Sequence, residues 1–342
     1  MRLARSLLIF AIVAATYGTA ARDAAAQSRP AAVPTDAPAD VRPGSITSED
    51  VAYPFPSTYL PLTMYGQDVR MAFMDVAASG TPNGHTVVLF HGNNFAGFYF
   101  GGVIDALRKE GFRVVAPDQI GYGRSSKPII PYNFNDMARN TRAILQSLKI
   151  DRVMVVGHSM GGMLAARFAT QYPDVVERVV LYNPIGLVDQ RFTRPAGSVD
   201  DAYTQTLSSS YQTVKAALMR YVAHNESAWT LEFEQYTRVR YAWTLGAEWP
   251  RLAMVQALLG QVIYQDPVVS DWLHIKAPTL LFGGAEDVLP GSAALFQERM
   301  AVAAKTIPSG RLHLIPGLGH VPHLEAPEKT YPPLLAFLRE GL

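Results

Sequence analysis

Short apolar runs alternate with longer segments of helical periodicity along most of the chain. Runs rich in valine, leucine and phenylalanine predict strands at 59–65, 69–76, 86–90, 113–116, 152–156, 179–182, 279–282 and 311–315. Apolar positions at helical spacing predict helices at 102–110, 135–148, 160–172, 292–300 and 330–339. The first two strands are joined through 66–68 and predict an antiparallel hairpin at a sheet edge. The remaining alternation indicates an α/β fold, with a mostly parallel sheet flanked by helices on both faces.

Residues 187–266 break this alternation, so we divide the rest of the core into 57–186 and 267–342. The inserted segment has no convincing strand pattern and is predicted to form a helical cap over the carboxyl ends of the strands, where such sheets bind ligands. Aromatic residues recur along it, namely Tyr203, Tyr211, Tyr221, Trp229, Phe233, Tyr236, Tyr241, Trp243 and Trp249. We expect most of them to pack within the cap or against the sheet, and a minority to line a substrate pocket.

The N-terminus is typical of a secretory signal peptide over residues 1–26, with Arg2 and Arg5 before an apolar run. At about 11 to 15 residues the run is shorter than the ~20 that a membrane span needs. We therefore expect export to a bacterial periplasm or beyond, with no stable membrane insertion after cleavage. A retained membrane anchor and an ordinary buried helix are the alternatives. Residues 27–56 are rich in proline and predict an extended linker outside the fold.

Composition excludes several classes of function. Of 342 residues, 49% are hydrophobic and 17% charged, which suits a large buried core. Lys plus Arg number 30 against 29 Asp plus Glu, so nucleic acid is not an expected partner. The absence of cysteine rules out disulfides, thiolate nucleophiles and Cys-ligated zinc. Without an H-E-x-x-H or clustered carboxylate pattern, we expect no metal and no cofactor.

The pattern Gly-x-Ser-x-Gly at 157–161 lies between a predicted strand and a predicted helix. A strand-turn-helix junction of this kind exposes its serine, here Ser159, as a nucleophile. Gly157 and Gly161 are needed because neighbouring main chains approach too closely for a side chain. The amide of Met160 opens the helix and can stabilise a developing anion, which makes it half of an expected oxyanion hole.

A serine hydroxyl needs a base and an acid that orients the base. Asp287 follows a late strand and is the expected acid, with Glu286 and Asp189 as weaker candidates. His320 lies in a glycine-rich loop after the last strand and is the expected base, with His323 as the alternative. The order serine, aspartate, histidine along the chain is the one typical of this junction.

The second oxyanion donor is expected in the loop after the strand at 86–90. We assign it to the backbone amide of Asn93, with Asn94 as second choice. His91 is expected to shape this loop through hydrogen bonds. His158 neighbours the serine but should point away from it.

These motifs together resemble those of capped α/β-hydrolase-fold serine hydrolases, a family that includes haloperoxidase-like esterases and meta-cleavage carbon-carbon hydrolases. The resemblance covers roughly 59–342 and rests on His91-Gly92-Asn93, 118–126 followed by Lys127-Pro128, 157–162, 284–287 and 319–325. Haloalkane dehalogenases and epoxide hydrolases of this family use an aspartate at the position of Ser159, so their alkyl-enzyme ester is not expected here.

The resemblance implies hydrolysis of a carboxylic ester or similar acyl bond through an acyl-enzyme on Ser159. The cap aromatics suggest a small apolar or aromatic substrate. One alternative is carbon-carbon bond hydrolysis, for which Arg238, Arg240 and Arg251 could bind a dienoate, unless they only form solvated helix faces. The other is a non-catalytic ligand-binding protein, because this fold also hosts receptors.

Overall fold

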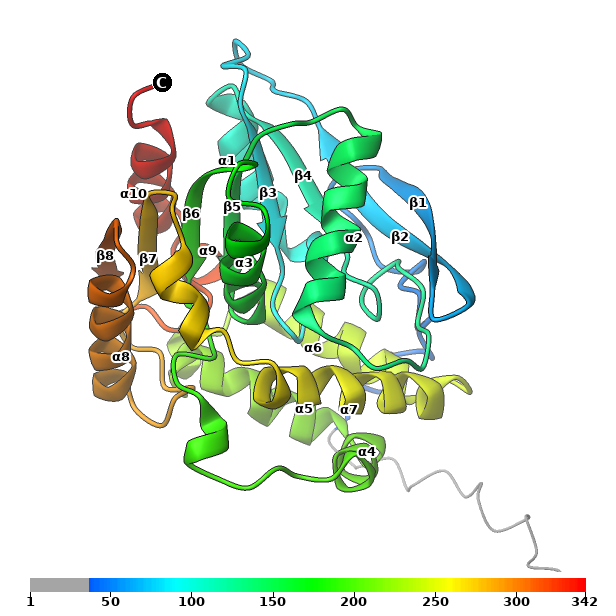
Figure 1. The fold of residues 1–342 in the computed structure, drawn as a ribbon. Coiled ribbons are helices and arrows are strands. Elements are labelled where there is room, and N and C mark those ends of the chain that lie inside the picture. Colours follow the sequence, from blue (N-terminus) through cyan, green and yellow to red (C-terminus); the bar gives the residue numbers. More distant parts are fainter. Residues whose placement is uncertain (1–36) are drawn as a thin grey trace, which may run out of the picture. The chain divides into compact units, whose positions relative to one another are not determined.

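A single sheet organises the part of the chain that the computed structural model describes, residues 37–342. Its strands are β1 (Ser57–Met64), β2 (Gln67–Val76), β3 (Thr86–Phe90), β4 (Arg113–Pro117), β5 (Val153–His158), β6 (Val176–Tyr182), β7 (Thr279–Gly284) and β8 (Gly310–Ile315). They lie in the order β1-β2-β4-β3-β5-β6-β7-β8 (Figure 1). The pairs β1–β2 and β2–β4 are antiparallel and the others parallel, which confirms the predicted edge hairpin and mostly parallel sheet.

Helices cover both faces of this sheet (Figure 1). They are α1 (Gly101–Lys109), α2 (Phe134–Ser147), α3 (Met160–Gln171), α8 (Ala293–Thr306), the short α9 (Pro322–Glu325) and α10 (Pro327–Arg339). Helix α2 packs on α3, which lies against β5 and β6, while α1 packs on α10. Every residue of the central strands β3 and β5 is buried, as expected for valine-rich parallel strands covered on both sides.

The segment between β6 and β7 is helical throughout its regular structure, with no strand among its described residues. Its main helices are α4 (Val199–Leu207), α5 (Tyr211–Met219), α6 (Leu231–Thr244) and α7 (Trp249–Gln265), which lie together at one end of the sheet (Figure 1). Tyr221, just after α5, contacts both the loop after β8 and the loop after β3. The cap helices therefore lie over the carboxyl ends of the parallel strands.

Residues 37–56 pack on the fold. The predicted linker outside the fold at 27–56 is therefore wrong for these residues. Ile46 and Val51 are only 3% and 8% exposed. Tyr53 donates a 2.6 Å hydrogen bond to the carboxylate of Asp118, and Arg124 donates to the carbonyl of Val51 at 3.0 Å. Composition did not predict this packing, because side chains of distant loops supply the hydrogen-bond partners that an irregular segment cannot supply itself.

The expected signal peptide at 1–26 and the start of the linker lie outside the described residues. Within 37–342, the structure contains no helix with both the length and the apolar character of a transmembrane segment.

Candidate active site

The turn at 157–161 has the strained geometry that its glycines predict. Ser159 has φ 58° and ψ −119°, a conformation that a residue with a side chain rarely adopts. A Cβ on Gly157 would lie 2.0 Å from the carbonyl oxygen of Gly161, and a Cβ on Gly161 would lie 2.1 Å from that of Phe90. Both glycines are therefore required, and the tight packing of β3, β5 and α3 imposes the strain on the serine.

Ser159 faces the loop that follows β3. Its hydroxyl forms no capping hydrogen bond with α3. A Cβ on Gly92 would lie 3.0 Å from the Cβ of Ser159, which shows how closely the two chains approach. Within residues 37–342, neither the Asn93 nor the Met160 amide donates a hydrogen bond to a loop or turn carbonyl. Both are available to an anion beside the serine.

Tyr122 connects the side chains of Asn93 and Met160, the two residues expected to supply the oxyanion hole. Its hydroxyl donates a 2.5 Å hydrogen bond to Oδ1 of Asn93 and lies 3.4 Å from Sδ of Met160. The only sequence signal for this role was its position inside the 118–126 motif.

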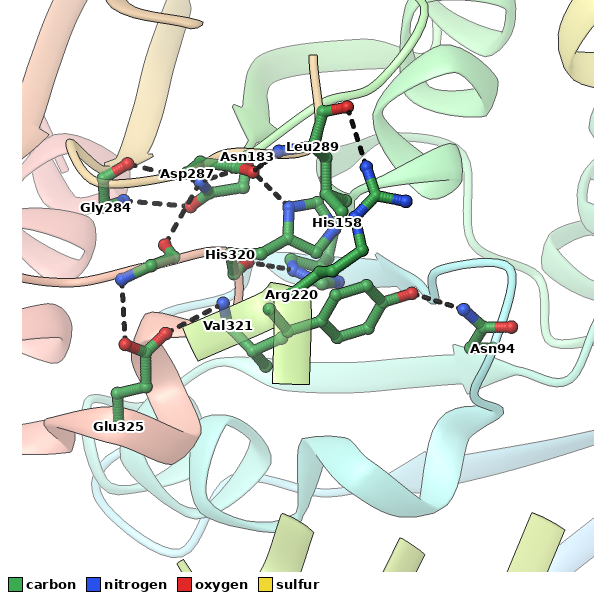
Figure 2. Close-up of polar contacts among 12 residues, drawn as sticks. Asn94, His158, Asn183, Arg220, Gly284, Asp287, Leu289, His320, Val321 and Glu325 are labelled. Atoms are coloured by element: carbon green, nitrogen blue, oxygen red, sulfur yellow. Dashed lines mark hydrogen bonds and ion pairs between the residues drawn. The ribbon is translucent and has the colours of Figure 1, made fainter. Parts of the chain in front are cut away.

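Asp287 and His320 are in direct contact. Oδ2 of Asp287 lies 2.6 Å from Nδ1 of His320, and the two side chains are 1% and 0% exposed. The carboxylate also accepts hydrogen bonds from Asn183 Nδ2 and from the Leu289 amide, as drawn in Figure 2. Both distances are 3.0 Å. Burial by itself would raise the pKa of Asp287, but the charge and hydrogen bond of His320 with the other donors outweigh it and lower that pKa. The carboxylate stays ionised and holds Nδ1 of His320 as a donor.

Nε2 of His320 is buried and has no hydrogen-bond partner among the described residues. The structure thus brings Asp287 and His320 together but forms no hydrogen bond between His320 and the Ser159 hydroxyl. The His320 ring lies 4.9 Å from the ring of His158, which immediately precedes the serine. Catalytic hydrogen bonds often tighten only when substrate binds, so this arrangement is compatible with proton transfer from Ser159 to His320.

Asn183, at the end of β6, positions Asp287 and was missed by sequence reasoning. Its φ of 38° is one that asparagine tolerates better than most residues. While Nδ2 donates to Asp287, Oδ1 accepts a 2.9 Å hydrogen bond from the amide of Gly284. The side chain thereby joins the ends of β6 and β7. Its position directly after a strand was the only signal in the sequence.

Glu325 holds the loop that carries His320. Its two carboxylate oxygens accept hydrogen bonds from the amides of Gly319, at 2.8 Å, and Val321, at 3.1 Å, one on each side of the histidine (Figure 2). Burial raises the pKa of Glu325, partly offset by these two amides. The backbone on both sides of His320 is thereby fixed.

His158 points away from the serine, into a chain of buried hydrogen bonds. The Gly92 amide donates to the Tyr99 hydroxyl at 3.0 Å, and that hydroxyl lies 2.8 Å from Nδ1 of His158. Nε2 of His158 lies 2.7 Å from the carbonyl oxygen of His320. Burial, together with His320 and His323, lowers the pKa of His158 well below its usual value. We therefore assign a neutral imidazole that accepts from Tyr99 and donates to His320.

The alternative acids and the alternative base lie in other surroundings. Asp189 pairs with Arg191 at 2.6 Å, and Glu286 is exposed. Nδ1 of His323 lies 3.1 Å from the Tyr182 hydroxyl, and burial lowers its pKa to about 3. His91 shapes its loop as expected, through the Gly92 carbonyl and the Gln119 amide. None of these carboxylates contacts His320.

Two cavities border the loop after β3. The larger, which we call the cleft, has a volume of about 590 Å³ and lies among α4, α5, α6 and α7, with Asn93 and Asn94 also lining it. The smaller, the narrow cavity, also touches Asn93 and Asn94 and is lined by Trp243. No aromatic residue of the described part of the chain lines the cleft, and the cap aromatics Phe233, Tyr241 and Trp249 are buried in packing.

No group of three or more potential metal ligands occurs within the described part of the chain.

Comparison with known proteins identifies the family. The model of the alpha/beta hydrolase fold family matches residues 85–327. A solved structure from Pseudomonas aeruginosa PAO1, described as a probable hydrolytic enzyme, is 36% identical with a TM-score of 0.82, covering 87% of this chain and 99% of its own. A protein of Yersinia enterocolitica, provisionally named carbamate hydrolase RutD, is 30% identical over 271 residues, which is 78% of this chain and 91% of that protein.

A further relative, an uncharacterized protein of Mycobacterium tuberculosis, is similar over part of its length. It is 37% identical over 132 residues, which is 39% of this chain and 36% of that protein. The matched family model spans most of the sheet and the cap, and includes Ser159 and His320. As its sequence motifs predicted, the chain belongs to the α/β-hydrolase fold family of hydrolases.

Proposed function

We propose that the protein is a serine hydrolase that cleaves a carboxylic ester, or a similar acyl bond, through an acyl-enzyme on Ser159. The observation that carries this proposal is the 2.6 Å contact between Asp287 and His320, which leaves Nε2 of His320 without a partner beside the strained serine turn. A buried carboxylate, an oriented imidazole and an unused serine hydroxyl are the groups that acyl transfer needs.

In the first half-reaction, Nε2 of His320 accepts the proton of Ser159 as Oγ attacks the carbonyl carbon. The carbonyl oxygen becomes an anion and binds the amides of Asn93 and Met160. Asp287 stabilises the imidazolium that forms. His320 then returns the proton to the leaving oxygen, which departs as an alcohol and leaves the acyl group on Ser159. Water repeats the sequence, releasing the acid and restoring the serine.

The name of the Yersinia relative supports acyl chemistry in general, since carbamate hydrolysis also proceeds through attack on a carbonyl. Carbon-carbon bond hydrolysis could use the same residues and would show as turnover of a vinylogous diketone with none of esters. A non-catalytic role would show as failure of a folded protein to react with an organophosphonate.

The test is hydrolysis of p-nitrophenyl esters from acetate to decanoate by the wild-type protein and by Ser159→Ala. Removing the serine of such a triad should reduce kcat by at least about 10³-fold. Ser292→Ala, which alters only the N-cap of α8, is the matched control and should turn over esters like the wild type. Undiminished activity in Ser159→Ala would refute the mechanism.

We also propose export through residues 1–26. N-terminal sequencing of the mature protein should begin at Ala21 or Gln27. A mature chain that starts at Met1 would contradict export by a cleaved signal.

A further inference from the structure

Arg240, on α6, lies beside the expected oxyanion loop. It lines both the cleft and the narrow cavity, as do Asn93 and Asn94. Nη1 of Arg240 is 3.4 Å from the carbonyl oxygen of Asn94. A group bound by this guanidinium would therefore lie beside the loop that contains Asn93 and Asn94.

The charge of Arg240 is not balanced by its surroundings. Among residues 37–342, no aspartate or glutamate lines either cavity, and Arg240 is the one charged residue that lines the cleft. In contrast, Arg238 on the same helix pairs with Asp40. The narrow cavity also contains Lys127, but its ammonium donates to the carbonyls of Tyr122, Gly123 and Ser125. Arg240 is thus the cation left available in these cavities.

Most of the hydrogen-bonding capacity of Arg240 is unused. A guanidinium has five N–H donors. Nε is buried and has no partner within the described residues, and Nη1 makes only the long contact to Asn94. Burial lowers the pKa of Arg240, partly offset by Tyr221 and Tyr122. The Arg240 side chain is half-buried. A partly desolvated cation without a counterion is costly, and a bound anion would relieve that cost.

The rest of the cleft suits a polar substrate and not the apolar or aromatic one expected from the cap composition. Neutral hydrogen-bonding side chains from α4 to α7 line it, including Gln205, Thr206, Ser209, Thr213, Gln256 and Gln261. Because these side chains carry no charge, they can bind polar atoms of a substrate and leave Arg240 free to bind an anionic group.

We propose that Arg240 is a carboxylate-binding residue and that the preferred substrate is an acyl compound carrying a second, free carboxylate. A carboxylate is chosen because its planar pair of oxygens matches the guanidinium donors. This inference rests on the proposed function, since the carboxylate belongs to the compound cleaved at Ser159. Because Arg240 adjoins the oxyanion loop, the two ends of the acyl group must be close, as in a short dicarboxylic half-ester.

The test compares two glutarates that differ in one charge. The first is mono-p-nitrophenyl glutarate, and the second is its methyl ester, which is neutral. The ratio of their kcat/KM values cancels changes that affect both substrates. We expect the wild type to favour the half-ester, and Arg240→Met to lower the ratio by about 10- to 100-fold, as loss of hydrogen bonds to a charged group predicts.

Further variants separate the charge from a structural role. Arg240→Lys should retain part of the ratio, and Arg238→Met should leave the ratio at its wild-type value. Arg240→Gln serves if Arg240→Met does not fold, as judged by circular dichroism. A wild-type ratio near one, or an equal ratio in the wild type and the charge-removing variants, would overturn the proposal.

A binding measurement keeps this inference separate from the proposed function. Calorimetric titration of glutarate into the wild type and into the folded charge-removing variant needs no turnover. Glutarate binding that the variant loses supports the anion subsite even if neither ester is hydrolysed, in which case only the serine mechanism fails. Equal binding to both proteins, or binding to neither, counts against Arg240.

Discussion

Replacing Asn183 by alanine tests whether this residue holds Asp287, the expected acid, in place. The variant loses the 3.0 Å hydrogen bond to Asp287, which to a charged acceptor contributes about 1.5–3 kcal/mol. It also leaves the buried amide of Gly284 without its 2.9 Å acceptor, at about 1–3 kcal/mol. An alanine at φ 38° adds about 1 kcal/mol of backbone strain. The free energy of unfolding should therefore fall by at least about 3 kcal/mol.

The pH dependence gives a second readout of the same change. In the wild type, the pKa of Asp287 is lowered from 3.8, so its stabilisation is present above that value and is lost as pH falls through the folded-state pKa. Without Asn183 the pKa should rise, and the loss should begin at higher pH. The stability difference between variant and wild type should shrink at acidic pH, because a protonated Asp287 has less charge for Asn183 to stabilise.

The assays are urea unfolding at several pH values and the pH profile of kcat/KM. Asn183→Asp is the informative partner variant, because it keeps an acceptor for Gly284 but places a second carboxylate against Asp287. Two adjacent carboxylates cannot easily both ionise, so the acidic limb of kcat/KM should move to higher pH. An Asn183→Ala variant with wild-type stability and an unshifted acidic limb would refute the reasoning.

Two further predictions concern the serine turn and its support. Gly161→Ala should abolish soluble expression or folding, since its Cβ would lie 2.1 Å from the backbone oxygen of Phe90; a soluble variant with the wild-type melting temperature would contradict this. Tyr99→Phe leaves His158 Nδ1 and the Gly92 amide without the hydroxyl they share, at about 1–3 kcal/mol for each buried group. Thermal unfolding should therefore occur at lower temperature and ester turnover should fall, and unchanged values of both would show that the hydroxyl has no positioning role.

Local patterns in the sequence predicted much of the fold. The central strands of the sheet are short apolar runs, and the period change on either side of Ser159 located the turn from β5 into α3. β5 extends to His158, beyond the predicted strand, because Gly157 and His158 still pair with β6. Asp287 and His320 could be chosen as the candidate acid and base because each follows a predicted strand that ends at glycine or proline residues. Their catalytic roles stay a proposal.

What local patterns could not predict are contacts between segments distant in sequence. Asn183 reaches Asp287 across 104 residues, and this pairing exists only because β6 and β7 are neighbours in the sheet. The same holds for residues 37–56, whose composition suggested a linker but whose side chains pack on distant loops.

The cleft shows the same limit. The aromatic composition of the cap suggested an apolar pocket, yet α-helical packing buries most of those rings and leaves polar side chains and Arg240 at the cleft. Periodicity, turn chemistry and the order of residues along the chain can be recognised without the fold. The sequence by itself therefore determined the family, the serine turn and the candidate triad. Which side chains face one another, and which charge remains unpaired, depends on how the elements pack, and only the tertiary structure decided it.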